Sequence, residues 1–107
     1  MRAELPAARA ALTFDFWARG IPYTASVGLY PDGRVGEVFV NGEKRDTASD
    51  HDGRDIAILI SFALQHGAAP RDLARAMPRD GEGRAQGLAG ILLDEVLTML
   101  ADMGRGA

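Results

Sequence analysis

The stretch from Tyr30 to Val40 places a Pro-Asp-Gly turn between two apolar runs. Pro31 fixes its own φ near the value that a tight turn needs, and Gly33 can adopt the positive φ that closes the turn. Apolar runs on both sides of such a turn are typical of a β-hairpin. The sequence therefore predicts a pair of antiparallel strands here, and the rest of the fold has to pack around them.

Alternation of apolar and polar residues predicts three strands in the first part of the chain. The earliest is half-buried, because Leu12, Phe14 and Phe16 fall on one face. Gly20 and Pro22 interrupt the pattern before the next strand begins. The predicted strands cover residues 12–17, 23–30 and 35–40, after an irregular lead-in over residues 1–11.

The first predicted helix contains residues 56–64, which are apolar nearly all round. A helix without a polar face is typically central, so we expect it to pack across the sheet and to be buried on several sides. Ser49 or Asp50 is expected to cap its start by accepting free backbone N–H groups. Gly67 is expected to end it.

Two more helices are predicted before the end of the chain. Pro70 is expected at the first position of a short helix that stops before Pro78. The last helix is expected to run from about residue 85 to residue 103, with Gly104 ending it and residues 104–107 as a tail. Its apolar stripe is wider than a normal half-face.

Three strands followed by three helices indicate an α+β fold, a small antiparallel sheet of three strands with three helices packed on it. A chain of 107 residues is near the commonest domain size, so residues 1–107 are expected to form a single domain. The sequence contains no internal repeat and no linker long enough to divide it.

Composition excludes several classes of function. The chain has no cysteine, which excludes disulfides, thiolate metal sites and thiol redox chemistry. Its net charge of −3 argues against a broadly basic nucleic-acid surface. No apolar run is long enough to span a bilayer, and the first residues lack an apolar signal core. We therefore expect a cytoplasmic protein with no membrane partner, and the charge disfavours nucleic acid as a partner.

The residues Asp50 to Asp55 form the densest set of metal-capable side chains. His51 and Asp52 could meet a cation, but a calcium loop of this type needs a Glu where the chain has Ser61. Acids near the start of a helix are equally explained by its dipole. The sequence therefore favours the interpretation that this segment is the solvent-exposed start of a helix. The alternative is that it forms a site for a ligand or partner.

His66 and Glu37 complete the set of candidate site residues. His66 could act as a general base, although its position near a helix end explains it equally well. Glu37 is a carboxylate within an apolar strand, and alternation places it on the same face as Val35 and Phe39. A charged residue on an otherwise apolar face leaves open whether Glu37 belongs to a functional site or simply faces outward.

Several segments resemble the TSCPD domain, found in the C-terminal region of vitamin-B12-dependent (class II) ribonucleotide reductases. They are spread in order over roughly residues 5 to 100. The segments are Leu5-Pro6, Arg9, Thr13, the hairpin from Tyr30 to Val40 and the run from Ile60 to Gly67.

The resemblance implies a folded accessory domain without the catalytic barrel and without the cysteine tail of those enzymes. No catalytic position of the family falls on this chain, so we expect no catalytic residue, no metal and no cofactor. The isolated chain is expected to lack reductase activity, although homology would suggest a ribonucleoside-diphosphate reductase label.

Two functions remain open from the sequence. The chain could be a non-catalytic accessory or interaction module in deoxyribonucleotide synthesis, with a ribonucleotide reductase catalytic chain as partner. Alternatively, it could be an independent dimeric ligand- or nucleic-acid-binding protein that reuses the fold. A homodimer is expected, because Leu93 and Leu97 extend the apolar surface of the last helix beyond what one core should cover.

Overall fold

The computed structural model describes residues 2–104, so most of the predicted tail, residues 105–107, lies outside the described part of the chain. Three strands precede three helices, and the strands form one antiparallel sheet in the order β1-β2-β3. The α+β prediction is confirmed. The elements are β1 (Ala11–Ala18), β2 (Ile21–Leu29), β3 (Val35–Gly42), α1 (Ala48–Gln65), α2 (Pro70–Ala76) and α3 (Leu88–Asp102).

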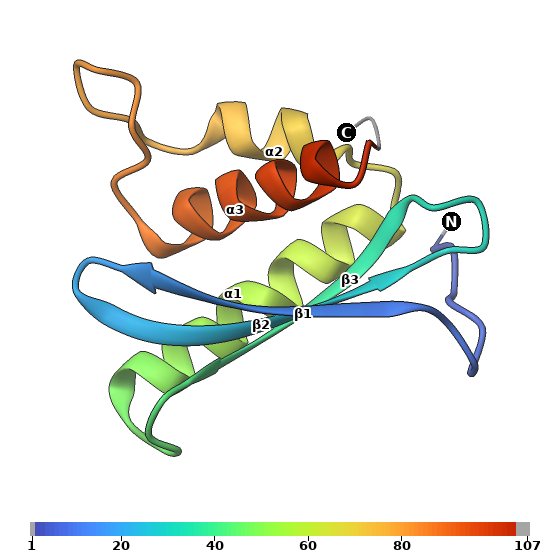
Figure 1. Ribbon diagram of the computed structural model, residues 1–107, viewed down its shortest axis with the longest axis horizontal. Helices are drawn as coiled ribbons and strands as arrows, with labels where there is room; N and C mark the ends of the chain where they lie inside the picture. Colours follow the sequence, from blue (N-terminus) through green and yellow to red (C-terminus); the bar gives the residue numbers. More distant parts are fainter. Residues whose placement is uncertain (1, 105–107) are drawn as a thin grey trace.

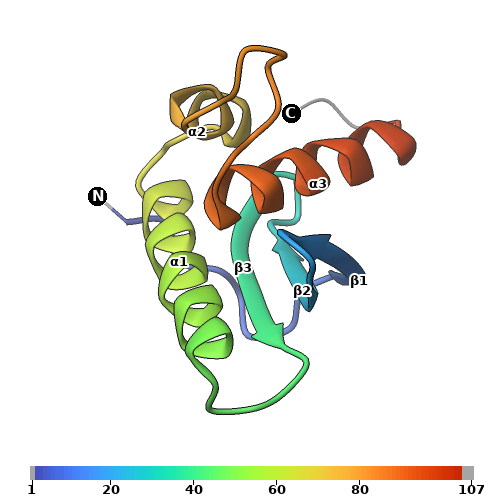
Figure 2. The same ribbon diagram turned by 90° about the vertical axis from the view of Figure 1, so that its left-hand side faces the viewer.

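The helices are not all on one face of the sheet. Figures 1 and 2 show α2 and α3 above one face, whereas α1 runs beside β3. The core lies between the sheet and α3, and its most buried side chains include Val27, Val40, Leu92, Leu93 and Val96. The opposite face of the sheet, which we call the outer face, is not covered by α2 or α3.

Both hairpin turns use residues with positive φ. Gly33 has a φ of 91°, and its N–H donates to the carbonyl of Tyr30 at 2.9 Å, so the predicted turn is confirmed. The other turn is Arg19-Gly20, with φ values of 55° and 80°. Positive φ at both central residues is the geometry of a two-residue hairpin of type I′. Sequence reasoning placed a break here but missed the hairpin, because Arg is an unusual first residue for this turn.

Helix α1 does not cross the sheet, which corrects the prediction of a central helix buried on several sides. Its side chains instead hydrogen-bond to the free edge of β3. Ser61 Oγ accepts from the N–H of Val38 at 2.8 Å and donates to the carbonyl of Val38 at 3.1 Å. Gln65 Nε2 donates to the carbonyl of Gly36 at 2.9 Å. A helix beside an edge buries one face only, so the other face of α1 is open to solvent.

The start of α1 is capped differently from the prediction, whereas its end is as predicted. Thr47, rather than Ser49 or Asp50, is the N-cap, and its side chain accepts from the N–H of Asp50. Gly67 ends the helix as predicted, with a φ of 103°. The N–H of the following residue, Ala68, bonds back to the carbonyl of Ala63, as in a Schellman motif.

Helix α3 begins at Leu88 rather than near residue 85, because residues 79–85 form a loop closed by a bridge between Arg79 and Ala85. The expectation of surplus apolar surface on this helix is wrong. Leu93 is 1% exposed and Leu97 is half-buried. The reason is that α2 and the sheet enclose α3 from two sides (Figure 1).

Candidate functional site

Two hollows in the surface have the size and lining of binding sites. The first, which we call the apolar groove, lies between β3 and α1 and has a volume of about 560 Å³. The second, which we call the polar cleft, lies between the β1–β2 turn and the starts of α1 and α3 and has a volume of about 510 Å³. Both volumes fall in the range of small-ligand or peptide-side-chain pockets.

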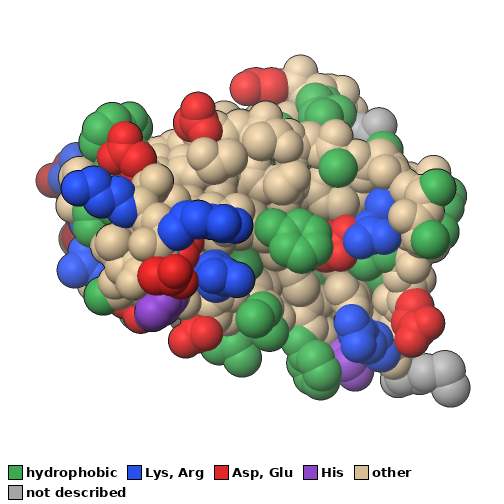
Figure 3. All heavy atoms as spheres, turned by 90° about the horizontal axis from the view of Figure 1, so that it is seen from below, with side chains coloured by type: hydrophobic (Ala, Val, Ile, Leu, Met, Phe, Trp, Pro, Cys, Tyr) green, Lys and Arg blue, Asp and Glu red, His purple; other side chains and the backbone are tan. Residues whose placement is uncertain are grey.

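Large exposed apolar side chains line the apolar groove. Phe39 is 53% exposed and reaches it from the outer face of the sheet, while Ile58 and Phe62, 66% and 58% exposed, reach it from α1. Arg2 and Arg54 also line the groove. Figure 3, a view of the molecule from below, shows single apolar side chains among clusters of charged ones on this side.

Glu37 lines the apolar groove but is not a free acid. It is buried, its carboxylate pairs with Arg9 of the lead-in, and its side chain lies against Gly28 of the neighbouring strand. The pairing register shifts between Gly28 and Leu29. This shift places Val35 in the core, so the prediction that Glu37 shares a face with Val35 is wrong, although Glu37 does share the outer face with Phe39.

His66 lies at the end of α1, next to the groove. Its ring stacks on Phe62 with 4.2 Å between ring centroids, and its Nδ1 lies 2.8 Å from the carbonyl oxygen of Phe62. Both contacts hold the imidazole against its own helix. His66 therefore supports the position of Phe62 in the groove wall.

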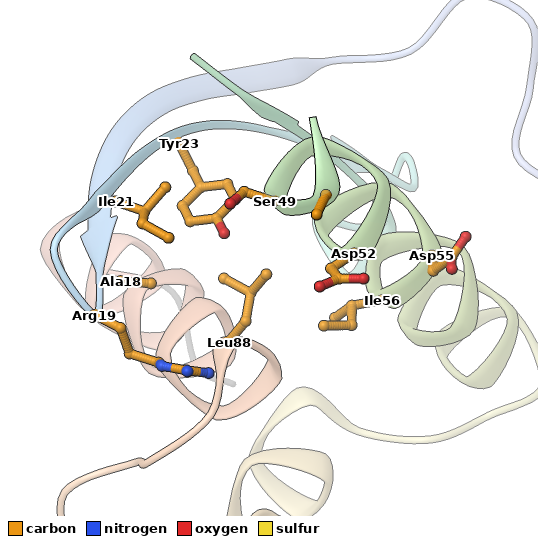
Figure 4. A pocket seen from close by; sticks show the side chains of 10 residues that line it. Ala18, Arg19, Ile21, Tyr23, Ser49, Asp52, Asp55, Ile56 and Leu88 are labelled. Atoms are coloured by element: carbon orange, nitrogen blue, oxygen red, sulfur yellow. The ribbon is translucent and has the colours of Figure 1, made fainter. Parts of the chain in front are cut away.

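Asp52 lines the other hollow, the polar cleft. Figure 4 shows Arg19 on one side of the cleft and Asp52 on the other, and Tyr23 and Ser49 also line it. Tyr23 is 6% exposed and lines the cleft. The apolar part of the lining comes from Ala18, Ile21, Ile56 and Leu88.

The structure separates the residues of the Asp50–Asp55 cluster. His51 points to Asp46, with Nε2 3.6 Å from Oδ1, while Asp50 is buried under the end of β3. Asp52 faces the polar cleft. Within the described range 2–104, no three His, Asp or Glu side chains are placed to hold a metal ion.

The two hollows therefore account for three of the four candidate residues. Glu37 lines the groove and His66 flanks it, Asp52 lines the cleft, and His51 lies apart. Sequence reasoning missed the side chains that dominate each hollow, namely Phe39, Ile58 and Phe62 in the groove and Arg19 and Tyr23 in the cleft. A signal was present for α1, because a helix that is apolar all round is either fully buried or has an apolar surface for a partner.

Comparison with known proteins adds one relationship. Over 66 residues, the chain is 36% identical to the vitamin B12-dependent ribonucleotide reductase of Rhodopirellula baltica. The match covers 62% of this chain and 6% of that reductase, so the chain corresponds to a small part of the enzyme. No family model and no solved structure matches the chain. None of the helices described within residues 2–104 has the length and apolar character needed to cross a membrane.

Proposed function

We propose that this chain is a TSCPD-type accessory domain in deoxyribonucleotide synthesis, and that it binds the catalytic chain of a ribonucleotide reductase through the apolar groove. The identity to a B12-dependent reductase supports the link to that enzyme class. The observation that carries the binding role is the group of Phe39, Ile58 and Phe62, which stay largely exposed around a groove of about 560 Å³.

Large apolar side chains gathered around one groove give a partner several anchoring points. Aromatic and arginine side chains dominate the binding energy of protein interfaces, and the groove has both. Arg54 is 57% exposed and lies 3.8 Å from Asp50, so its guanidinium is available to a second carboxylate. The expected occupant is an apolar segment of the catalytic chain with an acidic residue beside it.

The proposed role is non-catalytic for this chain. Because the chain contains no cysteine, any thiol chemistry of nucleotide reduction has to come from the partner. The accessory domain would contribute binding and positioning. It would be expected to form no deoxyribonucleotide alone in the presence of adenosylcobalamin, nucleotide and dithiol.

A binding measurement with the purified catalytic chain of the same organism's B12-dependent reductase tests the proposal. Ile58→Glu and Phe62→Glu place a charge in the groove and should weaken binding by about tenfold or more, as expected for central interface residues. Leu59→Glu is the matched control. Leu59 is 69% exposed on the same helix but does not line the groove.

The expected pattern is loss of binding for the two groove variants, unchanged binding for the Leu59 variant, and unaltered helix content in all three. Absence of binding by the wild-type chain, or equal loss in the Leu59 variant, would contradict the proposal.

A second candidate function, ligand binding in the polar cleft, is favoured by Arg19 and Tyr23. Arg19 is held at a positive φ of 55°, a conformation that non-glycine residues rarely adopt. Residues in strained backbone conformations are common at binding sites, and Tyr23 lines the same cleft. Opposing Arg19 and Asp52 side chains suit a small molecule that carries an anionic group together with a hydroxyl or amine.

Replacement of Arg19 separates this function from a purely structural role. Arg19→Asn should raise stability by about 1 kcal/mol, because Asn tolerates the left-handed conformation. Inorganic phosphate or acetate should raise the unfolding temperature of the wild-type chain, and Arg19→Asn should abolish this rise. Arg45→Asn, on the exposed loop after β3, is the control for lost charge. If neither anion raises the unfolding temperature of the wild-type chain, the anion site is excluded.

A further inference from the structure

We infer that the free edge of β1 is a dimerisation site, at which two copies of this chain pair antiparallel to form one continuous six-stranded sheet. The two edges of the sheet differ in their protection. The edge of β3 is covered by side chains of α1, which bond to backbone groups of Gly36, Val38 and Gly42. In the described chain, no such backbone or side-chain bond reaches the outer edge of β1.

The register of the first hairpin shows which groups of β1 point outward. A two-residue turn joins Ala18 to Ile21 as a hydrogen-bonded pair. Because hydrogen-bonded and non-hydrogen-bonded pairs alternate, the even-numbered residues of β1 bond to β2. The outward backbone groups belong to Ala11, Thr13, Asp15 and Trp17, which we call the β1 edge.

An exposed edge of this length is a template for a further strand. Natural proteins block such edges with proline, lysine, a bulge or a covering helix. Within residues 11–18, β1 has no proline, lysine, bulge or covering helix; Asp15 is its one charged residue, and its pairing with β2 is regular throughout. The sheet is therefore protected at one edge and open at the other (Figure 2).

The sequence of β1 selects one register for a pair with a twofold axis. With Phe14 on the axis, Thr13 of each copy lies opposite Asp15 of the other, and Ala11 lies opposite Trp17. This register uses almost the whole strand and places a hydroxyl donor opposite a carboxylate. Centring the pair on Asp15 would oppose two carboxylates, which is unfavourable. Centring it on Thr13 would leave Trp17 beyond the partner strand.

Burial at the β1 edge fits the same arrangement. Leu12 and Phe14 are only half-buried on the core side, although the equivalent positions of β2 are fully covered. In the paired sheet, Leu12 lies opposite Phe16 of the second copy and Phe14 lies opposite its own equivalent. Trp17, now 68% exposed on the outer face, gains a cross-strand neighbour. The second copy thus covers the apolar surface that one chain leaves open.

The first test measures the mass of the protein in solution, for the wild-type chain and for a variant that lacks one backbone N–H of the β1 edge. At tens of micromolar, light scattering should give twice the 11.4 kDa mass of the chain. Asp15→Pro removes an outward N–H that β2 does not use, so it should give a monomer that stays folded. Asp15→Ser, which keeps the N–H, is the matched control and should remain dimeric. A monomeric wild-type chain, or a dimeric proline variant, overturns the inference.

The second test reads the register and does not depend on how well the proline variant folds. The chain has no cysteine, so introduced thiols report without background. Residues in a hydrogen-bonded pair lie about 5.5 Å apart between Cα atoms, within the range that a disulfide can bridge. A mixture of Thr13→Cys and Asp15→Cys chains with different tags should therefore crosslink under mild oxidation.

Each cysteine variant alone should stay uncrosslinked, because identical residues are then diagonal neighbours, about 7–8 Å apart. Crosslinking of the mixture, without crosslinking of either variant alone, supports this register. An uncrosslinked mixture, or equal crosslinking of Thr13→Cys alone, contradicts it.

Discussion

Asp50 is a charged side chain that the fold buries almost completely. It is 1% exposed, and its two carboxylate oxygens accept from the N–H groups of Gly42 and Asp46, both at 3.0 Å. The bonds from Asp46 and Gly42 hold the pKa of Asp50 below its ordinary value of 3.8. Asp50 thereby fixes the end of β3 and the start of α1 in one network.

The lowered pKa gives a pH dependence with a defined sign. The unfolded chain binds a proton at Asp50 more readily than the folded chain, so the carboxylate stabilises the fold above the unfolded pKa. This contribution is lost as the pH falls below about 4 and passes through the lower folded pKa. Asp50→Asn should therefore have a lower unfolding temperature than wild type at pH 7, and the difference should shrink on acidification.

The matched control is Asp102→Asn, at an exposed position near the end of α3. It should unfold at nearly the wild-type temperature over the same pH series. A constant difference between wild type and Asp50→Asn from pH 7 to pH 3 would show that the carboxylate charge is not what matters.

Between elements, Gly28 of β2 and Glu37 of β3 determine how the lead-in docks on the sheet. A Cβ on Gly28 would lie 2.7 Å from Cγ of Glu37, so only glycine leaves room for the carboxylate to reach Arg9. Three segments meet at this point, two of them through side chains. The absence of one methyl group therefore allows the partly buried ion pair.

Gly28→Ala should destabilise the protein by about 1–3 kcal/mol, because Glu37 must move and leave its partner. Glu37→Ala should also destabilise it, because Arg9 then loses its carboxylate. In the double variant, Gly28→Ala with Glu37→Ala, the added methyl group has space. Its loss of unfolding free energy should therefore be clearly smaller than the sum of the losses in the two single variants. Chemical denaturation of the three variants measures this coupling. Strictly additive losses would contradict the contact.

At the scale of the whole molecule, the two proposed surfaces lie at opposite edges of the sheet. The apolar groove uses β3 and α1, whereas the β1 edge is two strands away (Figure 2). A dimer formed through β1 would therefore leave both grooves open. The arrangement allows one catalytic chain to bind each copy, with the pair of copies joining two such assemblies.

Local chemistry explains which parts of the fold were predictable from sequence. Gly33, Gly67 and Pro70 were placed correctly because turn closure, helix ending and helix initiation depend on the backbone of one or two residues. The three strands followed from the alternation of apolar and polar residues. The four candidate site residues were less predictable, since they divide between two hollows formed by segments distant in sequence.

The sequence by itself determined the α+β class, the β2–β3 hairpin and the residues at which the helices stop, because these depend on short-range periodicity and backbone preference. Only the tertiary structure decided that α1 lies beside β3 and leaves Ile58 and Phe62 exposed, while α3 is enclosed. Hydrophobic periodicity measures how apolar each face is, and it contains no information on which neighbour covers that face. For α1 the deciding interactions were the hydrogen bonds of Ser61 and Gln65 to the edge of β3, between residues more than twenty positions apart.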